Sequence, residues 1–159
     1  MLKTIRRDEF QFLKKILVGY FEHIKNNKDT LIPKFFGLHK LVYRKKKYLR
    51  GWLQTKKVYF IIMNNLFNSE LEIHKRYDLK GSTYKRSVSS MEPGIAKKDL
   101  DFIRDERKLG LETFHRDELL AIIEKDLEFF KKHRIIDYSL MVGYHTKGPV
   151  TFSPFNKTR

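Results

Sequence analysis

The stretch Val58-Tyr59-Phe60-Ile61-Ile62-Met63 is the longest uninterrupted apolar run of the chain. It is rich in β-branched and aromatic side chains, so it predicts a strand over 57–63. A helix that crosses a bilayer needs about 18 or more apolar residues in a row, so this run is too short to span a membrane. Upstream of it, residues 35–43 predict a second strand that is interrupted at Gly37, and the cations from Arg44 to Lys47 predict an exposed hairpin loop.

Two amphipathic helices are expected elsewhere in the chain, because apolar residues recur every three to four positions over 8–25 and over 116–133. Alternating apolar and polar residues over 70–77 predict a further strand, and 139–145 predicts a short last strand. Residues 78–96 are polar and predict a loop, longer than compact domains usually keep unless the loop has a function. This order of elements indicates an α+β fold with an antiparallel sheet.

The composition of the chain excludes several kinds of site and indicates the charge of its partner. The chain has 159 residues, 34 Lys and Arg against 19 Asp and Glu, a net charge of +15, and no cysteine. The length suits one domain or one lobe, and the lack of cysteine excludes disulfides, thiolate metal sites and a cysteine nucleophile. The charge indicates an anionic partner: nucleic acid, an acidic membrane or a phosphorylated small molecule. Residues 1–7 lead into charged positions rather than an apolar signal segment, so we expect a soluble intracellular protein.

Three segments combine residue types that carry chemistry. The loop from Asp78 to Arg86 has the lysine, glycine and hydroxyls of an anion-binding loop, although composition alone favours a solvated basic turn. Asp137 lies at a helix–strand junction, where it is a candidate general base, while a capping aspartate is the more common use. Lys3 ends a short predicted strand and is followed by Asp8 and Glu9 in the next helix, the order of the phosphate-holding ion pair of kinases.

These segments resemble the phosphatidylinositol phosphate kinase family, in the family's order, over residues 3 to about 145. The Asp-Leu-Lys-Gly-Ser-Thr segment from Asp78 and the Asp-Tyr-Ser-Leu segment from Asp137 are similar to hallmarks of that family rather than of kinases in general. Met63-Asn64-Asn65 and Tyr84-Lys85-Arg86 resemble the phosphatidylinositol-4-phosphate 5-kinase branch more than the 5-phosphate 4-kinase branch. The other matching segments are Lys3-Thr4-Ile5, Leu31 to Leu38, and Lys98 to Phe102.

The resemblance implies a fold and roles for particular residues. It implies a two-lobed kinase-like α+β fold in which Asp137 is the catalytic aspartate and Lys80 is the lysine beside the transferred phosphoryl group and the lipid phosphate. Lys3 resembles the strand lysine that holds the ATP phosphates, with Glu9 as its helix partner. The resemblance thus favours functional roles for Lys80 and Asp137 over a solvated basic turn and a capping aspartate.

The same resemblance implies how adenine and lipid are held. Residues 63–66 resemble the hinge, whose backbone groups, including those of Asn65, bind adenine, while Leu66 packs on it and Met141 lies under it. The basic pair Lys85 and Arg86, together with other basic segments, is expected to face anionic lipid, where each cation near the surface adds about 1 kcal/mol.

The implied reaction is in-line transfer of the ATP γ-phosphoryl to an inositol-ring hydroxyl of phosphatidylinositol 4-phosphate, which gives phosphatidylinositol 4,5-bisphosphate. The implied cofactors are ATP and Mg²⁺, and the implied partners are phosphatidylinositol 4-phosphate and the anionic inner-leaflet surface. A cytoplasmic protein, peripheral on the plasma membrane, is therefore expected. Nucleic acid is not expected as a partner, because only the charge and Trp52 favour it and no nucleic-acid-binding motif supports it.

The resemblance also has limits. Only two residues precede Lys3, fewer than the strands and Gly-rich loop that cover ATP in the family, and residues after His145 match nothing in it. We therefore expect a partial kinase core over 1–145, truncated at both ends, and a divergent or disordered tail over 146–159. The family's later metal-binding aspartate has no counterpart, so no metal ligand is assigned and the isolated chain is expected to be inactive or severely impaired. A module that binds anionic phosphoinositide membranes without catalysis is the alternative.

Overall fold

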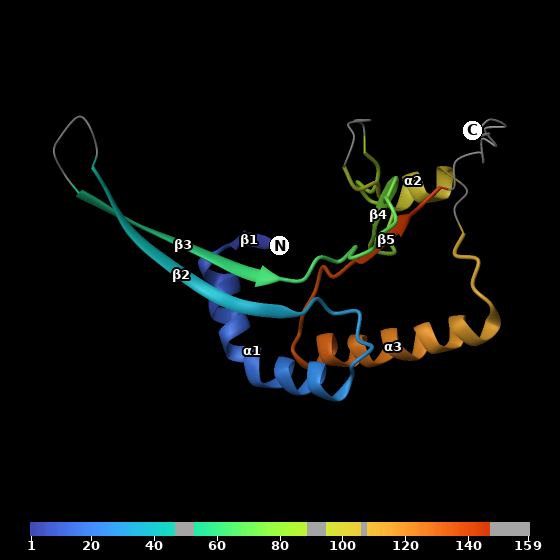
Figure 1. Cartoon of the computed structure of the whole chain (residues 1–159), viewed down its shortest axis with the longest axis horizontal. Helices are drawn as coiled ribbons and strands as arrows, with labels where there is room; N and C mark the ends of the chain where they lie inside the picture. The colour runs from blue at the N-terminus through green and yellow to red at the C-terminus, as the bar shows by residue number, and fades with distance from the viewer. Residues whose placement is uncertain (47–52, 89–94, 106–107, 147–159) are drawn as a thin grey trace, which may run out of the picture. The chain divides into compact units, whose positions relative to one another are not determined.

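The computed structural model describes residues 1–46, 53–88, 95–105 and 108–146 (Figure 1). The chain forms two compact units, which are treated separately. Unit 1 comprises residues 1–68 and 110–136, and unit 2 comprises residues 69–109 and 137–159.

The apolar run becomes the central strand of unit 1. β3 (Leu53–Met63) lies between β1 (Leu2–Ile5) and β2 (Phe35–Lys46), and both neighbours are antiparallel to it. The two predicted strands are confirmed, and both are longer than expected. The pairing shifts between Phe35 and Gly37, which explains the predicted interruption there. The loop expected from Arg44 was wrong as far as Lys46, because these residues continue β2 in register with β3; Lys47 lies outside the described residues.

Two long helices supply the rest of unit 1. α1 (Arg7–Asn26) and α3 (Thr113–Lys132) confirm the two amphipathic helices, each within three residues of the expected start. Their apolar faces share the main core cluster, in which the Tyr20 ring lies 5.0 Å from Phe35 and 6.5 Å from Phe129, measured between ring centroids. The Tyr20 hydroxyl donates to the Pro33 carbonyl and accepts from the Phe35 N–H, both at 2.8 Å, so the loop that enters β2 is held against α1.

A buried carboxylate fastens α3 to the end of α1. Asp126 is 5% exposed, and its Oδ1 atom lies 2.7 Å from His23 Nε2 and 2.5 Å from Thr30 Oγ1. The Leu31 N–H donates to Asp126 Oδ2 at 2.9 Å. One side chain of α3 therefore binds both the last turn of α1 and the loop that follows it.

Unit 2 is built on a two-stranded antiparallel ladder, β4 (Lys75–Leu79) against β5 (Leu140–Tyr144), with the short helix α2 (Asp99–Arg104) beside it. Tyr77 is completely buried and makes edge contacts with Phe102 and Tyr144. The last strand is confirmed. The strand expected over 70–77 begins only at Lys75, and α2 was not predicted from the sequence.

Helices and antiparallel strands thus form a mixed α+β fold, which confirms the predicted fold class. The division into a core over 1–145 and a tail over 146–159 stays a prediction, and the tail beyond His145 lies outside the described residues except for Thr146. Within the described ranges, neither long helix is apolar enough over its length to cross a membrane.

The first testable prediction concerns Asp126. Asp126→Ala leaves the His23, Thr30 and Leu31 donors without their acceptor, so we expect unit 1 to lose about 3 kcal/mol of unfolding free energy in urea titrations. The control is Asp117→Ala on the same helix, where the carboxylate is 60% exposed and pairs with Arg116, and it should cost about 0.5 kcal/mol or less. Equal losses in the two variants would contradict the assigned role.

Candidate functional site

The structure brings together the two residues that the resemblance marks as catalytic. Lys80 Nζ lies 3.5 Å from Asp137 Oδ1, although 57 positions separate them in the sequence (137 − 80), and both belong to unit 2. The Asp137 side chain is 83% exposed and that of Lys80 is 31% exposed. The pair therefore offers a carboxylate and an ammonium group side by side, open to a ligand.

The backbone at Lys80 is fixed by a carboxylate from α2. Asp99 Oδ1 accepts the N–H of Lys80 at 3.0 Å and that of Gly81 at 2.8 Å. Gly81 has a φ of +71°, in the left-handed region that glycine enters without steric cost. This turn lets two successive N–H groups converge on one oxygen, so the start of the Lys80 side chain has a defined position.

The other oxygen of Asp99 binds a buried arginine from the end of the same loop. Arg86 Nε donates to Asp99 Oδ2 at 2.7 Å, and Arg86 Nη2 donates to both the backbone carbonyl and the carboxylate of Asp78. Arg86 and Asp99 are each 9% exposed. The lipid contact expected at Arg86 stays a prediction; in this structure its guanidinium binds Asp99 and Asp78 inside the unit and closes the 78–86 loop.

The electrostatics follow from these contacts. Burial alone would raise the pKa of Asp99, but the hydrogen bonds from Arg86 and from the Gly81 and Lys80 N–H groups outweigh it and hold the pKa below its ordinary value. The hydrogen bond to Asp99 raises the pKa of Arg86 despite its burial. Both groups are thus charged across the ordinary pH range, and the pair persists there.

A second carboxylate of α2 holds the chain just after the loop. Asp101 is 4% exposed, accepts the N–H groups of Val88 and Lys98 at 3.0 and 3.1 Å, and accepts the Ser87 hydroxyl at 3.1 Å. Burial alone would raise the pKa of Asp101, yet these hydrogen bonds lower it overall. Asp99 therefore anchors the loop, and Asp101 anchors the residues that follow it, to one short helix.

Asp105, which directly follows α2, supplies a third carboxylate. Its Oδ2 atom lies 2.6 Å from Lys97 Nζ, 2.6 Å from the Tyr77 hydroxyl and 3.7 Å from Lys75 Nζ. The hydrogen bonds from Lys97 and Tyr77, aided by the charges of both lysines, lower the pKa of Asp105 from 3.8 to about 2. This cluster joins α2 to β4, the strand from which the Lys80 loop leaves.

The remaining residues of unit 2 flank the pair. Asp137 has a φ of +60°, a conformation that costs a non-glycine residue about 1 to 2 kcal/mol and that clusters at functional sites. Met141 pairs with Asp78 in the β4–β5 ladder, and Asp78 precedes Lys80 by two positions in the chain. Lys85 is exposed, also has a positive φ of 54°, and lies over the Tyr84 ring with its Nζ 5.1 Å from the centroid.

The other predicted residues lie in unit 1. Lys3 is exposed in β1, pairs with Ile61 of β3, and forms no ion pair within the described part of the chain. No ion pair joins it to Glu9 within the described residues. Glu9 Oε2 instead accepts the Arg6 N–H at 2.6 Å and lies 3.6 Å from Arg6 Nε, so it caps the start of α1. The predicted pairing of Lys3 with Glu9 is therefore not formed in this structure.

The predicted hinge is held at one end and open at the other. Met63 exchanges hydrogen bonds with Met1 at 2.7 and 2.9 Å, and Asn64 exchanges them with Lys34 at 2.9 and 3.0 Å. The Asn65 side chain bonds the backbone of Phe67. The Leu66 N–H has no hydrogen bond within the described residues, and its side chain is 40% exposed. A donor and an apolar side chain are thus available where adenine is expected.

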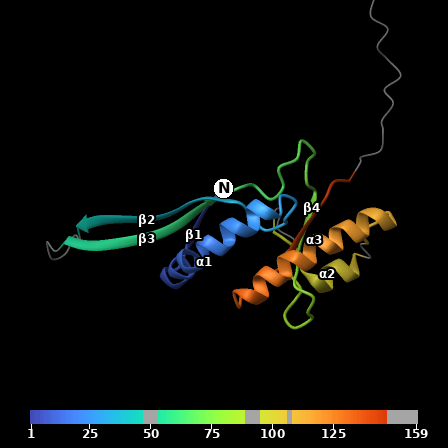
Figure 2. The ribbon, with the colours of Figure 1, turned by 90° about the horizontal axis from the view of Figure 1, so that it is seen from below.

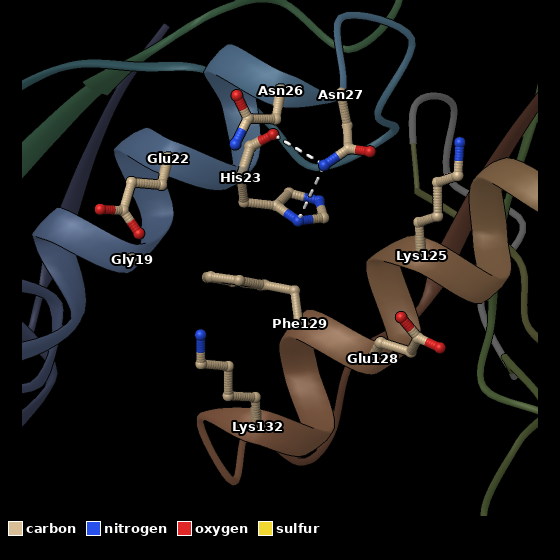
Figure 3. Close-up of a pocket in the computed structure, with 9 residues that line it drawn as sticks. All are labelled: Gly19, Glu22, His23, Asn26, Asn27, Lys125, Glu128, Phe129 and Lys132. Atoms are coloured by element: carbon tan, nitrogen blue, oxygen red, sulfur yellow. Dashed lines mark hydrogen bonds between the residues drawn. The ribbon is translucent and has the colours of Figure 1, made fainter.

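Sequence reasoning missed a groove of about 390 Å³ between α1 and α3 (Figure 3). The His23 ring packs on Phe129 at its floor, with 4.7 Å between ring centroids. The rim carries two acidic and two basic side chains, so their formal charges cancel: Glu22, Glu128, Lys125 and Lys132. No motif could have revealed it, because its residues share only a helix–helix contact.

Comparison with known proteins gives a consistent result. A family model described as phosphatidylinositol-4-phosphate 5-kinase matches residues 1–156. Proteins named phosphatidylinositol 4-phosphate 5-kinase from Plasmodium falciparum, Schizosaccharomyces pombe (its3) and Drosophila melanogaster (type-1 sktl) are each 38% identical to the chain over 91% of its length. The chain spans 8%, 19% and 18% of these relatives, respectively.

The second prediction tests the anchor of the Lys80 loop. Asp99→Ala strands a buried guanidinium and frees two N–H groups, so we expect a loss of about 3 to 5 kcal/mol in unit 2 and faster amide hydrogen exchange at Lys80 and Gly81. The control is Glu72→Ala, whose carboxylate is 83% exposed and should leave exchange at those amides unchanged. Unchanged exchange in Asp99→Ala would refute the anchoring role.

The third prediction concerns pH. Because the folded pKa of Asp105 is about 2 and its ordinary value is 3.8, its contribution to stability is fully present above pH 3.8 and is lost as pH falls towards 2. Asp105→Asn should therefore be less stable than the parent chain by about 2 kcal/mol at pH 6, and the difference should shrink steadily below pH 4. Urea titrations of both proteins across this range measure it. A difference that stays constant down to about pH 2 would contradict the assignment.

Proposed function

Because the chain belongs to the phosphatidylinositol-4-phosphate 5-kinase family, we propose that it carries part of the catalytic machinery of a lipid kinase. The proposed reaction transfers the ATP γ-phosphoryl to an inositol-ring hydroxyl of phosphatidylinositol 4-phosphate and yields the 4,5-bisphosphate. The proposed place of action is the inner leaflet of the plasma membrane. The observation that carries the proposal is the ion pair between Lys80 and Asp137.

Asp137 has the features of a group that receives a proton. Its carboxylate is 83% exposed, so a substrate hydroxyl can reach it, and the left-handed backbone directs it from a fixed junction before β5. A positioned carboxylate accepts the hydroxyl proton or orients the hydroxyl for in-line attack on phosphorus.

Lys80 supplies the positive charge. Phosphoryl transfer gathers negative charge on the transferred group, and a preorganised ammonium stabilises that charge without having to reorganise. Asp99 fixes the backbone at Lys80 through two hydrogen bonds, which supports such preorganisation. Without a ligand, the Lys80 ammonium pairs with the Asp137 carboxylate. When a phosphate binds, it replaces this carboxylate as the anion beside Lys80.

We assign the nucleotide to residues of unit 1. Lys3 has no carboxylate partner within the described residues, so its ammonium is available to the phosphates of ATP. The free Leu66 N–H and the exposed Leu66 side chain suit adenine. Bound ATP supplies the phosphoryl group. The adenine contact expected at Met141, which belongs to unit 2, stays a prediction.

Among the described residues, no group of three or more histidine and carboxylate side chains could hold a metal ion such as the Mg²⁺ that the resemblance implies. Mg²⁺ is often bound through only one or two carboxylates plus substrate phosphates, but the second carboxylate near Lys80, that of Asp99, is occupied by two backbone N–H groups and by Arg86. Each proposed step is therefore assigned to the protein's own side chains.

A second candidate function is binding to anionic phosphoinositide membranes without catalysis. It is favoured by exposed, unneutralised cations such as Lys85, which lies over an exposed tyrosine at the turn of the loop. The two functions differ in whether phosphate is incorporated into lipid.

The fourth prediction separates them. Because the isolated chain is expected to be severely impaired, the reference is the residual incorporation of the parent chain. With vesicles that contain phosphatidylinositol 4-phosphate and γ-labelled ATP, Asp137→Asn should reduce that incorporation about 10²- to 10⁴-fold, and Lys80→Met about 10²- to 10³-fold. The controls Asp117→Asn and Lys132→Met remove exposed charges from α3 and should retain activity. Undiminished activity in Asp137→Asn would refute the assigned catalytic role. A chain that binds these vesicles but incorporates no phosphate would favour the second function.

A further inference from the structure

The strands β2 and β3 continue as a two-stranded ribbon beyond the three-stranded part of the sheet. β1 pairs only with residues 59–62 of β3, whereas β2 pairs with β3 back to Leu53. Both views of unit 1 show this ribbon projecting past β1 and α1 (Figures 1 and 2). A ribbon of two strands without a covering layer is marginally stable in water, so its two faces need an explanation.

The pairing register sorts the ribbon into two chemically different faces. One face continues the side of Tyr59, which packs on Phe10 of α1 with 4.9 Å between ring centroids. Beyond Tyr59 this cationic face carries Lys40, Arg44 and Lys57, together with Val42 and Thr55. The opposite, mainly apolar face carries Leu41, Tyr43, Val58 and Phe60 at alternate positions, together with His39 and one described cation, Lys56, which pairs with Tyr43.

The apolar face is exposed. Leu41 is 52% exposed and Tyr43 is 39% exposed, so the described residues of unit 1 do not cover them. The face continues along the sheet to Leu2 and Ile62, which pair with each other and are 62% and 36% exposed. This is a contiguous apolar strip, the kind of surface that marks a contact with a partner or a membrane.

The cations of the ribbon are not neutralised. No Asp or Glu occurs between Asp29 and Glu70, a stretch that includes both strands. Within the described residues, Lys40, Arg44, Lys56 and Lys57 are exposed and form no ion pair. The ribbon thus has one mainly apolar face and a positive charge that no acidic residue of the surrounding sequence neutralises.

We propose that the β2–β3 ribbon lies in the headgroup layer of an anionic bilayer, with its apolar face towards the acyl chains. Amphipathic segments that bind in this way bury their apolar side about 5 to 10 Å into the interface, and long cationic side chains reach the lipid phosphates from that depth. Leu41 and Tyr43 supply the apolar contact, and Lys40, Lys57 and Arg44 supply the charge.

The two faces together select the bilayer over other anionic partners. An RNA would neutralise the cationic face and leave the apolar strip in water. A second protein copy packed on the apolar strip would leave the cations unpaired and would bring like charges together. Only an anionic lipid surface matches both faces at once. The inference builds on the proposed function only because a lipid kinase must meet its substrate in a membrane.

The test uses the whole chain and vesicles without phosphoinositide or ATP, so its result does not depend on catalysis. In sedimentation with phosphatidylcholine vesicles, with or without phosphatidylserine, the parent chain should bind the anionic vesicles and not the neutral ones. Two variants, Leu41→Asn/Tyr43→Asn and Lys40→Glu/Lys57→Glu, should each weaken that binding about tenfold or more.

Matched controls change equally exposed residues elsewhere in unit 1. Phe114→Asn/Leu120→Asn removes two apolar side chains of α3 that are 67% and 49% exposed, and Lys14→Glu/Lys15→Glu reverses two exposed cations of α1. Each control should change binding less than about twofold if the ribbon carries it. Thermal melting of every variant verifies that it is folded.

A second measurement reports directly on insertion. Because the chain has no cysteine, Leu41→Cys and Leu120→Cys can each be labelled at one position with an environment-sensitive fluorophore. Anionic vesicles should brighten and blue-shift the label at position 41 and leave the label at position 120 unchanged.

Three outcomes would overturn the proposal. Equal losses in the ribbon and control variants would remove the ribbon's special role. Binding to RNA that depends on the lysines but not on Leu41 and Tyr43, with no binding to vesicles, would make the cationic face a nucleic-acid surface. A concentration-dependent dimer that Leu41→Asn/Tyr43→Asn abolishes, again without vesicle binding, would make the apolar strip a contact between copies.

Discussion

The carboxylate of Asp99 is the constraint on which the site of unit 2 depends. One of its oxygens receives two successive backbone N–H groups at the start of the 78–86 loop, and the other receives the guanidinium at its end. A buried ion pair repays its desolvation only when its remaining hydrogen-bonding groups are also satisfied. Here the Nη2 group of Arg86 donates to Asp78 while its Nε donates to Asp99. A lysine could not replace this arginine, because a single ammonium group lacks the planar set of donors that reaches both carboxylates. The loop therefore has one closed form, and Lys80 leaves it at a fixed place.

The features that follow from local pattern were predictable, and those that follow from burial were not. The apolar run located β3, and the three-to-four-residue periodicity located both long helices. The six residues of α2 are too few and too charged to show a helical period, so the helix was missed. Lys80 and Arg86 look alike in sequence, as cations in a polar loop. Only packing separates them, since Arg86 is 9% exposed while Lys80 reaches Asp137 at the surface.

The ribbon shows the opposite error. Four consecutive cations from Arg44 to Lys47 favour a loop by composition, but cross-strand pairing overrides that preference at least as far as Lys46. A strand alternates its side chains between two faces, whereas a loop does not. The register therefore assigns each side chain to a face: Arg44 shares one face with Lys40 and Lys57, whereas Tyr43 and Leu41 share the other with a single described cation, Lys56. A composition count cannot supply this segregation, because it arises only when the register is known.

The net charge of +15 consequently divides into two populations with different physical roles. Arg86, Lys97 and Lys75 form ion pairs with buried or half-buried carboxylates of unit 2. These pairs stabilise the unit, and because their charges are neutralised they add little to its long-range attraction for anions. Lys40, Arg44 and Lys57 have no carboxylate within the described residues of unit 1 and retain their charge. Attraction to an anionic surface should therefore depend on where a lysine lies rather than on the total. Reversing two ribbon lysines and reversing two helix lysines change the net charge equally, yet the first change acts on the ribbon itself and should alter the field over the apolar strip more.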